Sequence, residues 1–139
     1  MTWPSEEEGL RRLKVPDGRS VRYMPNSTPE CFNSIERGVV FVVAWWSIYS
    51  LQAWVRMKDL LEAIDDTRIL EVVVLDIDGM TGFESTAIGA TIAGVGEMVC
   101  VKSGFLMADK WEAEPEAVRA SAMRLLAQFR ELPGSDQWT

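Results

Sequence analysis

VVFVVAWW, at residues 39–46, is the stretch that decides the fold. It is the longest uninterrupted apolar run in the chain, and it is rich in β-branched and aromatic residues. A run of this length is too short for a buried helix and is typical of a central strand that is covered on both faces. It is also far shorter than the roughly 20 apolar residues that a membrane-spanning helix needs, so we expect no membrane association.

The segments around this strand alternate between helical and strand-like patterns. Residues 47–65 form a predicted helix, in which apolar residues recur at helical spacing, namely Leu51, Trp54, Val55, Leu61 and Ile64. A second buried strand is predicted over residues 69–77 and a weak edge strand over residues 20–24. Between that edge strand and the central strand, Thr28 and Pro29 predict the start of a helix that ends at Gly38.

The C-terminal half predicts a turn over residues 76–82, a short helix over 83–92 and a break at Gly94–Gly96. Strands over 98–102 and 105–109 flank Ser103–Gly104, whose spacing suits a tight hairpin. Pro115 opens a final helix with a clean apolar stripe, made of Val118, Ala122, Leu125, Leu126 and Phe129. Parallel pairing with helical crossovers, followed by an antiparallel hairpin, predicts an α/β sandwich. We divide the chain into a polar leader (1–19), whose order the sequence leaves open, one domain (20–131) and a tail (132–139).

Composition excludes several kinds of site. The chain has 139 residues, a net charge of −7 and no histidine, which argues against nucleic acid as a partner and against histidine-based catalysis or metal binding. Cys31 and Cys100 lie far apart and form no metal-ligand pair. Asp76 and Asp78 are most simply explained as strand-ending turn residues. We expect no metal and no cofactor, and, because the acidic N-terminus is unlike a secretory signal, a cytoplasmic location.

Several motifs, taken in order, resemble the thioredoxin family over residues 20–130. The segment Trp46-Ser47-Ile48-Tyr49-Ser50 follows the central strand at the place of that family's Trp-Cys-Gly-Pro-Cys. Residues 75–78 are similar to the aspartate-bearing end of the family's third strand. Residues 95–104 resemble its Ile-Pro-Thr segment, the next strand and the Lys-Asn-Gly turn. The resemblance implies a thioredoxin-like three-layer α/β/α sandwich with a central mixed sheet, a C-terminal β-hairpin and a final helix.

The same resemblance implies that the family's redox chemistry is missing. Ser47 and Ser50 occupy the two cysteine positions, while the family's buried aspartate, its neighbouring lysine and its cis-proline fall at Phe41, Val74 and Gly96. Thiol–disulfide exchange needs a thiolate stabilised at a helix N-terminus and a second thiol that resolves the mixed disulfide. We therefore expect no such exchange, no catalytic residue and no enzymatic activity.

Apolar residues at the degenerate site predict a binding surface instead. Ile48 and Tyr49 replace Gly-Pro in a loop that is normally exposed, and exposed aromatic and aliphatic side chains are typical interface anchors. We predict a non-catalytic protein-binding module of the chaperone, assembly-factor or scaffold type. Its predicted contacts are Trp45, Trp46, Ile48 and Tyr49, with Val95 and Gly96 across the groove.

Four alternatives stay open at this point. The first is that these rings pack against the leader. The second is an acidic inhibitor or immunity-type protein that blocks a basic enzyme, because opposite charge accelerates association. The third is a non-redox enzyme that uses Ser47, Tyr49 or the carboxylates of Asp76 and Asp78, which requires a deep pocket with a perturbed titratable group. The fourth is a homodimer through the same apolar face.

Overall fold

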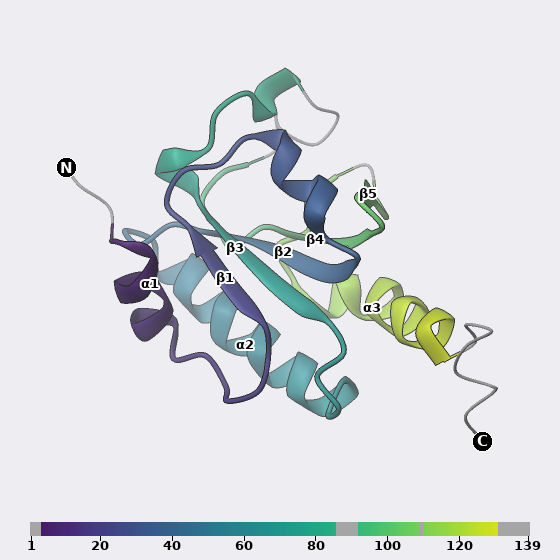
Figure 1. The fold of residues 1–139 in the computed structure, drawn as a ribbon. Helices are drawn as coiled ribbons and strands as arrows, with labels where there is room; N and C mark the ends of the chain where they lie inside the picture. The colour runs from purple at the N-terminus through teal and green to yellow at the C-terminus, as the bar shows by residue number, and fades with distance from the viewer. Residues whose placement is uncertain (1–3, 86–91, 109, 131–139) are drawn as a thin grey trace.

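The structure is a computed structural model, and it describes residues 4–85, 92–108 and 110–130 (Figure 1). In chain order its elements are α1 (Glu6–Leu13), β1 (Val21–Met24), the 3₁₀ helix η1 (Pro29–Ser34), β2 (Arg37–Val43), α2 (Ile48–Ile64), β3 (Glu71–Asp76), the 3₁₀ helices η2 (Ile77–Gly79) and η3 (Phe83–Ser85), β4 (Met98–Lys102), β5 (Phe105–Leu106) and α3 (Pro115–Arg130). None of the helices in these described ranges is long and apolar enough to cross a membrane.

The strands form one mixed sheet in the order β1-β3-β2-β4-β5. Strands β1 and β2 both pair with β3 in parallel, and β4 pairs antiparallel with β2 and with β5. The apolar run that contains β2 therefore lies at the centre of the sheet, as its composition predicted. The hairpin prediction is also confirmed, because β4 and β5 are joined at Ser103 and Gly104, which both have positive φ angles.

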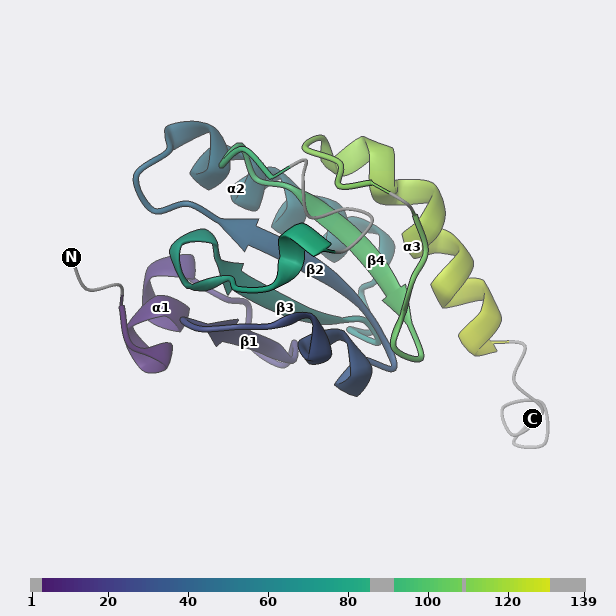
Figure 2. The ribbon, with the colours of Figure 1, turned by 90° about the horizontal axis from the view of Figure 1, so that it is seen from above.

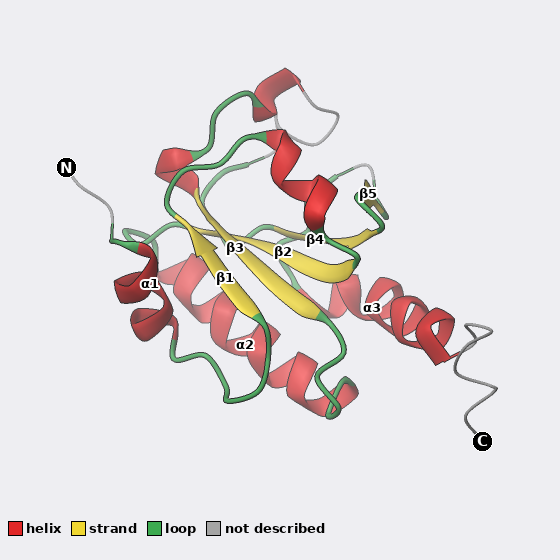
Figure 3. Cartoon of the chain, viewed as in Figure 1, coloured by secondary structure: helices red, strands yellow, loops and turns green. Residues whose placement is uncertain are grey.

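Side chains alternate between two cores on the two faces of the sheet. Val39, Phe41 and Val43 of β2 join a core that contains apolar side chains of α2 and α3, while Val40 and Val42 join a second core on the other face. Figure 3 shows the α-helices on one side of the sheet and the short 3₁₀ helices on the other. The α/β sandwich is confirmed, but its second outer layer consists of η1, η2, η3 and their connecting loops.

Several elements differ from their predicted bounds. The second hairpin strand, predicted over residues 105–109, covers only Phe105–Leu106, and the strand predicted over residues 69–77 covers Glu71–Asp76. The helix predicted from Thr28 to Gly38 is only the 3₁₀ helix η1, and the Thr28 hydroxyl donates to the Glu30 carboxylate and gives no side-chain cap. The central strand ends at Val43, three residues early, and the chain then turns into α2. Of the helix predicted over residues 83–92, only η3 falls within the described residues, and the predicted tail (132–139) falls outside them.

The polar leader packs against the domain along residues 4–19. Ser5 caps α1, Leu13 is buried in the α2 core, and the Trp54 indole N–H donates to the Leu13 carbonyl at 2.7 Å. Figure 2 shows α1 beside β1 at one edge of the sheet, with α3 at the opposite edge. The side chain of Arg19 is 2% exposed, and it ties the leader to the far end of α2.

Candidate functional site

The N-terminus of α2 is organised by two serines. Ser47 has an extended backbone conformation, and its hydroxyl accepts a hydrogen bond from the Ser50 amide at 3.4 Å, which makes it the N-cap of the helix. Ser50 is fully buried, and its hydroxyl accepts from the Ala44 amide at 2.9 Å. Both hydroxyls thus hold the turn between β2 and α2 in place.

Gly96 lies directly against this end of α2. A Cβ atom built on Gly96 would lie 2.5 Å from the Cβ of Ala53 and 3.4 Å from the Cα of Ser50, and its φ of +88° is one that favours glycine. The loop over residues 93–97 can approach the helix so closely because Gly96, Ala53 and Ser50 are all small. This contact brings Val95 next to the start of α2, where the sequence comparison placed it.

A buried carboxylate fixes the shape of that loop. Glu97 is 3% exposed, and its side chain accepts hydrogen bonds from the backbone amides of Ala93, Gly94 and Val95, the latter two at 3.1 and 3.2 Å. Its own carbonyl accepts from the Val42 amide of the central strand at 2.8 Å. These hydrogen bonds tie the loop over residues 93–97 to the central strand.

Four apolar side chains remain exposed around this framework, and together we call them the tip surface. Trp46 is 61% exposed, Ile48 64%, Tyr49 67% and Val95 37%. The Trp46 ring lies over the backbone of Gly94, where a built Cβ would come within 2.5 Å of the ring. The chain thus supports one side of the Trp46 ring and leaves most of it to solvent.

Two of the six predicted contact residues lie inward. Trp45 is half-buried, its indole N–H donates to Asp76 at 2.9 Å, and its ring meets the Tyr23 ring edge-on at 5.7 Å between centroids. Gly96 is buried against α2. Both residues pack inside the chain. The predicted contact residues that are exposed are therefore the four of the tip surface.

Asp76 forms the centre of a buried polar cluster beneath Trp45. It is fully buried and accepts from the Tyr23 hydroxyl at 2.5 Å, from the Trp45 indole and from the Asp78 amide at 3.0 Å. Burial, followed by the hydrogen bond to Asp76, raises the pKa of Tyr23 well above its usual range. Asp78 is exposed, so the two aspartates do not converge on one site; nor do three acidic or thiol side chains anywhere in the described ranges.

The inward face of α2 agrees only in part with the apolar set that its spacing predicted, since Trp54 and Leu61 are buried and Ile64 packs against the core. Leu51 and Val55 are 36% and 51% exposed, whereas Ser50, Ala53 and Met57 lie inside with Trp54 and Leu61. Small residues are needed inside because Gly96 approaches there. The sequence did carry this signal, since Ser50, Ala53, Trp54, Met57 and Leu61 follow the helical period equally well.

Neither thiol lies near the N-terminus of α2. Cys100 belongs to the core on the α2 side of the sheet, while Cys31 packs against the core on the other side. Burial raises the pKa of the Cys31 thiol to about 11 and that of Cys100 to about 12. The Lys58 ammonium group donates to the carbonyls of Leu13 and Lys14.

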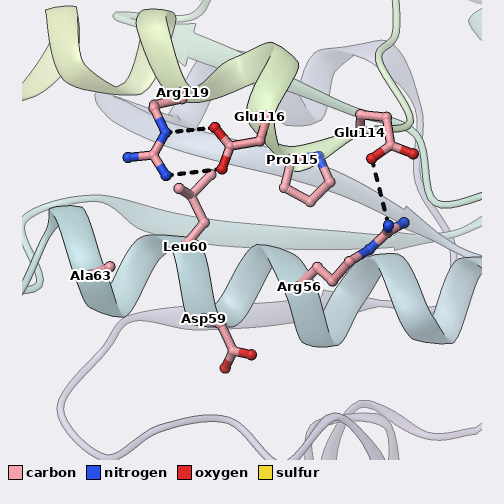
Figure 4. A pocket seen from close by; sticks show the side chains of 8 residues that line it. All are labelled: Arg56, Asp59, Leu60, Ala63, Glu114, Pro115, Glu116 and Arg119. Carbon is pink, nitrogen blue, oxygen red and sulfur yellow. Dashed lines mark hydrogen bonds and ion pairs between the residues drawn. The ribbon is translucent and has the colours of Figure 1, made fainter.

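A cleft of about 430 Å³ separates α2 from the start of α3 (Figure 4). Two ion pairs occupy its walls: Arg56 with Glu114 at 3.6 Å, and Arg119 with Glu116 at 2.7 Å. Each of these charges already has an opposite charge within the chain.

Comparison with known proteins supports the fold alone. No protein-family model and no curated protein sequence matches the chain. Among solved structures, it matches a chain from the structure reported for the thiol resolving mechanism of yeast mitochondrial 1-Cys peroxiredoxin via the glutathione and thioredoxin systems. That match has a TM-score of 0.51 at 18% identity and covers 69% of this chain and 85% of the other. The fold is thioredoxin-like.

Two thioredoxins also match the thioredoxin-like domain. They are the Schistosoma mansoni thioredoxin pre-protein, with a TM-score of 0.49 at 15% identity, and Fasciola hepatica thioredoxin, with 0.48 at 18%. The matches cover 78% and 76% of this chain and 99% and 97% of the two thioredoxins. At these identities the likeness says nothing about activity, which has to be argued from the site.

Proposed function

We propose that this thioredoxin-like chain is a non-catalytic protein-binding module that uses the tip surface. The observation that carries the proposal is the exposure of Trp46, Ile48 and Tyr49 by 61–67% at the start of a single helix. Two aromatic rings and a β-branched side chain together present a few hundred Å² of apolar surface, which is the size at which patches on soluble proteins are often functional.

The framework beneath the tip surface supports a binding role. Ser47, Ser50 and Glu97 hold the backbone on both sides of it through hydrogen bonds within the chain. A rigid backbone loses little conformational entropy when a partner binds, so more of the contact energy remains as affinity. Trp46, which is backed by Gly94 on one side, is placed as an anchor for the centre of an interface.

The chemistry of the same region supports a non-catalytic role. At neutral pH a serine hydroxyl supplies no thiolate, and the Ser50 hydroxyl is buried and bonded to the Ala44 amide. The carboxylate of Asp76 is enclosed by Tyr23 and Trp45. A partner of the chaperone-client or assembly type, with an apolar segment to offer, fits this surface better than a small substrate.

Affinity capture from a lysate of the source organism tests the proposal. The bait is wild-type chain beside the triple variant Trp46→Ala, Ile48→Glu, Tyr49→Ala, after circular dichroism has shown that both fold. A matched control, Asp66→Ala with Thr67→Ala, alters exposed residues at the other end of α2. We expect a protein that wild type and control capture and the triple variant loses.

Capture of the same proteins by all three baits overturns the proposal. The salt dependence of the association rate distinguishes the proposed function from the inhibitor alternative. An acidic inhibitor of a basic enzyme loses association rate steeply as salt rises, whereas binding through apolar anchors changes little.

A further inference from the structure

The edge of the sheet that carries the tip surface has no positive charge in the segments that form it. Strands β1, β2 and β3 run parallel and β4 is antiparallel to β2, so the segments that follow the first three strands and the one that precedes β4 meet at this edge. Their charged residues are the acids Asp78 and Glu97, and no lysine or arginine occurs in them (residues 25–29, 44–50, 77–82 and 92–97). A cation on a partner is therefore complementary to this edge.

Asp78 is the exposed one of these two acids. Asp76 accepts from the Trp45 indole at 2.9 Å and from the Asp78 amide at 3.0 Å, so two hydrogen bonds link Asp78 to the turn that leads into α2. No hydrogen bond or ion pair with another residue of the described ranges occupies the Asp78 carboxylate. Glu97, by contrast, is buried, and its carboxylate accepts from the amides of its own loop. Asp78 is thus the carboxylate at this edge that a partner can reach.

The chain itself brings one guanidinium to the same turn. Arg12 of α1 lies over the Trp45 ring, with its Cζ atom 5.5 Å from the ring centroid, and its charge is paired with Glu8 at 3.1 Å. An indole at this edge therefore accepts a planar cation on its face, as aromatic rings do in cation–π contacts. Trp46 and Tyr49 offer two more rings, and both are mainly exposed. Aromatic rings beside a free carboxylate suit an arginine better than a lysine, because the guanidinium is planar and weakly hydrated.

We propose that the tip surface binds a segment in which an arginine accompanies the apolar side chains, and that Asp78 selects this arginine. The inference rests on the proposed function and names the chemistry of its partner. An exposed ion pair contributes little to affinity, so we expect Asp78 to change the Kd about two- to fivefold. One such pair adds only a shallow salt dependence, unlike the steep one of an inhibitor that matches a whole basic surface.

Selection from a random peptide library displayed on phage tests the inference with the full chain as bait. Asp78→Asn removes the charge and keeps the shape of the side chain, and Asp66→Asn makes the same change at an exposed position at the other end of α2. We expect wild type and Asp66→Asn to enrich peptides that combine arginine with aromatic or aliphatic residues. Asp78→Asn should retain the apolar residues and lose the enrichment of arginine. A tip-surface variant without added charge, Trp46→Ala, Ile48→Ala, Tyr49→Ala, should enrich neither.

A double-mutant cycle on the most enriched peptide measures the contact itself. Fluorescence anisotropy of the labelled peptide should show a Kd about two- to fivefold higher for Asp78→Asn than for wild type. The difference should vanish when methionine replaces the arginine of the peptide.

The outcomes separate this inference from the proposed function. Apolar peptides without enriched arginine, or an arginine enrichment that Asp78→Asn retains, overturn the inference and leave the proposed function in place. Selection of no motif by wild type, or of the same motif by wild type and the tip-surface variant, overturns both.

Discussion

The two ends of α2 differ in what their side chains do: one end holds a buried ion pair, and the other exposes apolar side chains. At the C-terminal end, Arg19 inserts a guanidinium that is 2% exposed between Asp65 at 2.8 Å and Glu62 at 2.9 Å. Asp65 also accepts from the amides of Ile69 and Leu70, and Arg19 is the first cause of the lowered pKa of Glu62. At the N-terminal end, by contrast, Trp46, Ile48 and Tyr49 expose most of their apolar surface.

This difference separates structural residues from candidate binding residues. Removing one partner of a buried ion pair leaves the other charge in a dry environment, which costs stability. An exposed apolar side chain contributes little to the fold, because its surface remains in water in the native state. Substitutions at the C-terminal end should therefore change stability, and substitutions at the N-terminal end should change binding.

The largest expected effect is at the paired end. Arg19→Met keeps the length of the side chain but leaves Asp65 buried without its cation, so we expect a loss of about 3–5 kcal/mol in the free energy of unfolding. Urea denaturation followed by circular dichroism measures it. Arg68→Met, which removes an exposed partner of the same Glu62, should cost less than about 1 kcal/mol. Equal losses for the two variants contradict the structural role given to Arg19.

The second prediction concerns the glycine that lets the loop approach α2. Gly96→Ala adds a Cβ that meets Ala53 at 2.5 Å, at a φ of +88°, and should cost about 2–4 kcal/mol in unfolding free energy. Gly82→Ala is the matched control, because Gly82 has a φ of +80° and, among the described residues, a Cβ built on it meets the Pro29 ring at an ordinary contact distance of 3.5 Å. It should show the backbone cost alone, about 1–2 kcal/mol.

The third prediction concerns the position of the thiols, which lie in the interior and not at the N-terminal end of α2. Burial raises the pKa of Cys100 from 9.0 to about 12. Above pH 9 the unfolded thiol ionises while the native one stays neutral, so its contribution to stability is complete below pH 9 and is lost as the pH rises towards 12. We expect a loss of about 1 kcal/mol by pH 10. Cys100→Ala should show a shallower alkaline decline, and an identical slope in both proteins contradicts the assignment.

The smallest expected effect on stability is at the exposed end. Ile48→Glu removes an apolar side chain that is 64% exposed and places an acid in the first turn of α2, where the helix dipole favours it by about 0.3–1 kcal/mol. Stability should stay unchanged or rise slightly. The same change at the other end, Ile64→Glu, places an acid in the last turn beside the core and should cost about 1–2 kcal/mol. Thermal unfolding of the pair measures both, and a greater loss for Ile48→Glu reverses the comparison.

The central strand, the mixed sheet and the final helix follow from patterns that the sequence shows directly. Residues 39–44 of the apolar run are fully buried, as its composition predicted, and Gly104 suits the positive φ angle that it adopts in the hairpin turn. The exposure of Ile48 and Tyr49 followed from the loop that they replace in the thioredoxin resemblance.

Features that depend on close tertiary contact were not predictable. The inward face of α2 is set by the approach of Gly96 to Ala53, and two apolar faces of that helix satisfy the same period. The Trp45 side chain lies inward because its indole N–H donates to Asp76 and its ring packs against the Tyr23 ring. No local sequence pattern pairs residues so distant in the chain. In the sequence, Arg19 belongs to the polar leader, and no local pattern relates it to Asp65. Only the fold brings these two side chains together.

The most direct test of the central claim measures stability and capture on the same three proteins: wild type, the Trp46→Ala, Ile48→Glu, Tyr49→Ala variant and the Asp66→Ala, Thr67→Ala control. The predicted result is that the tip-surface variant keeps an unfolding free energy within about 1 kcal/mol of wild type and loses the partner that both other proteins retain. A tip-surface variant that loses several kcal/mol and yet captures the same proteins as wild type would show that these side chains serve the fold, and would contradict the account.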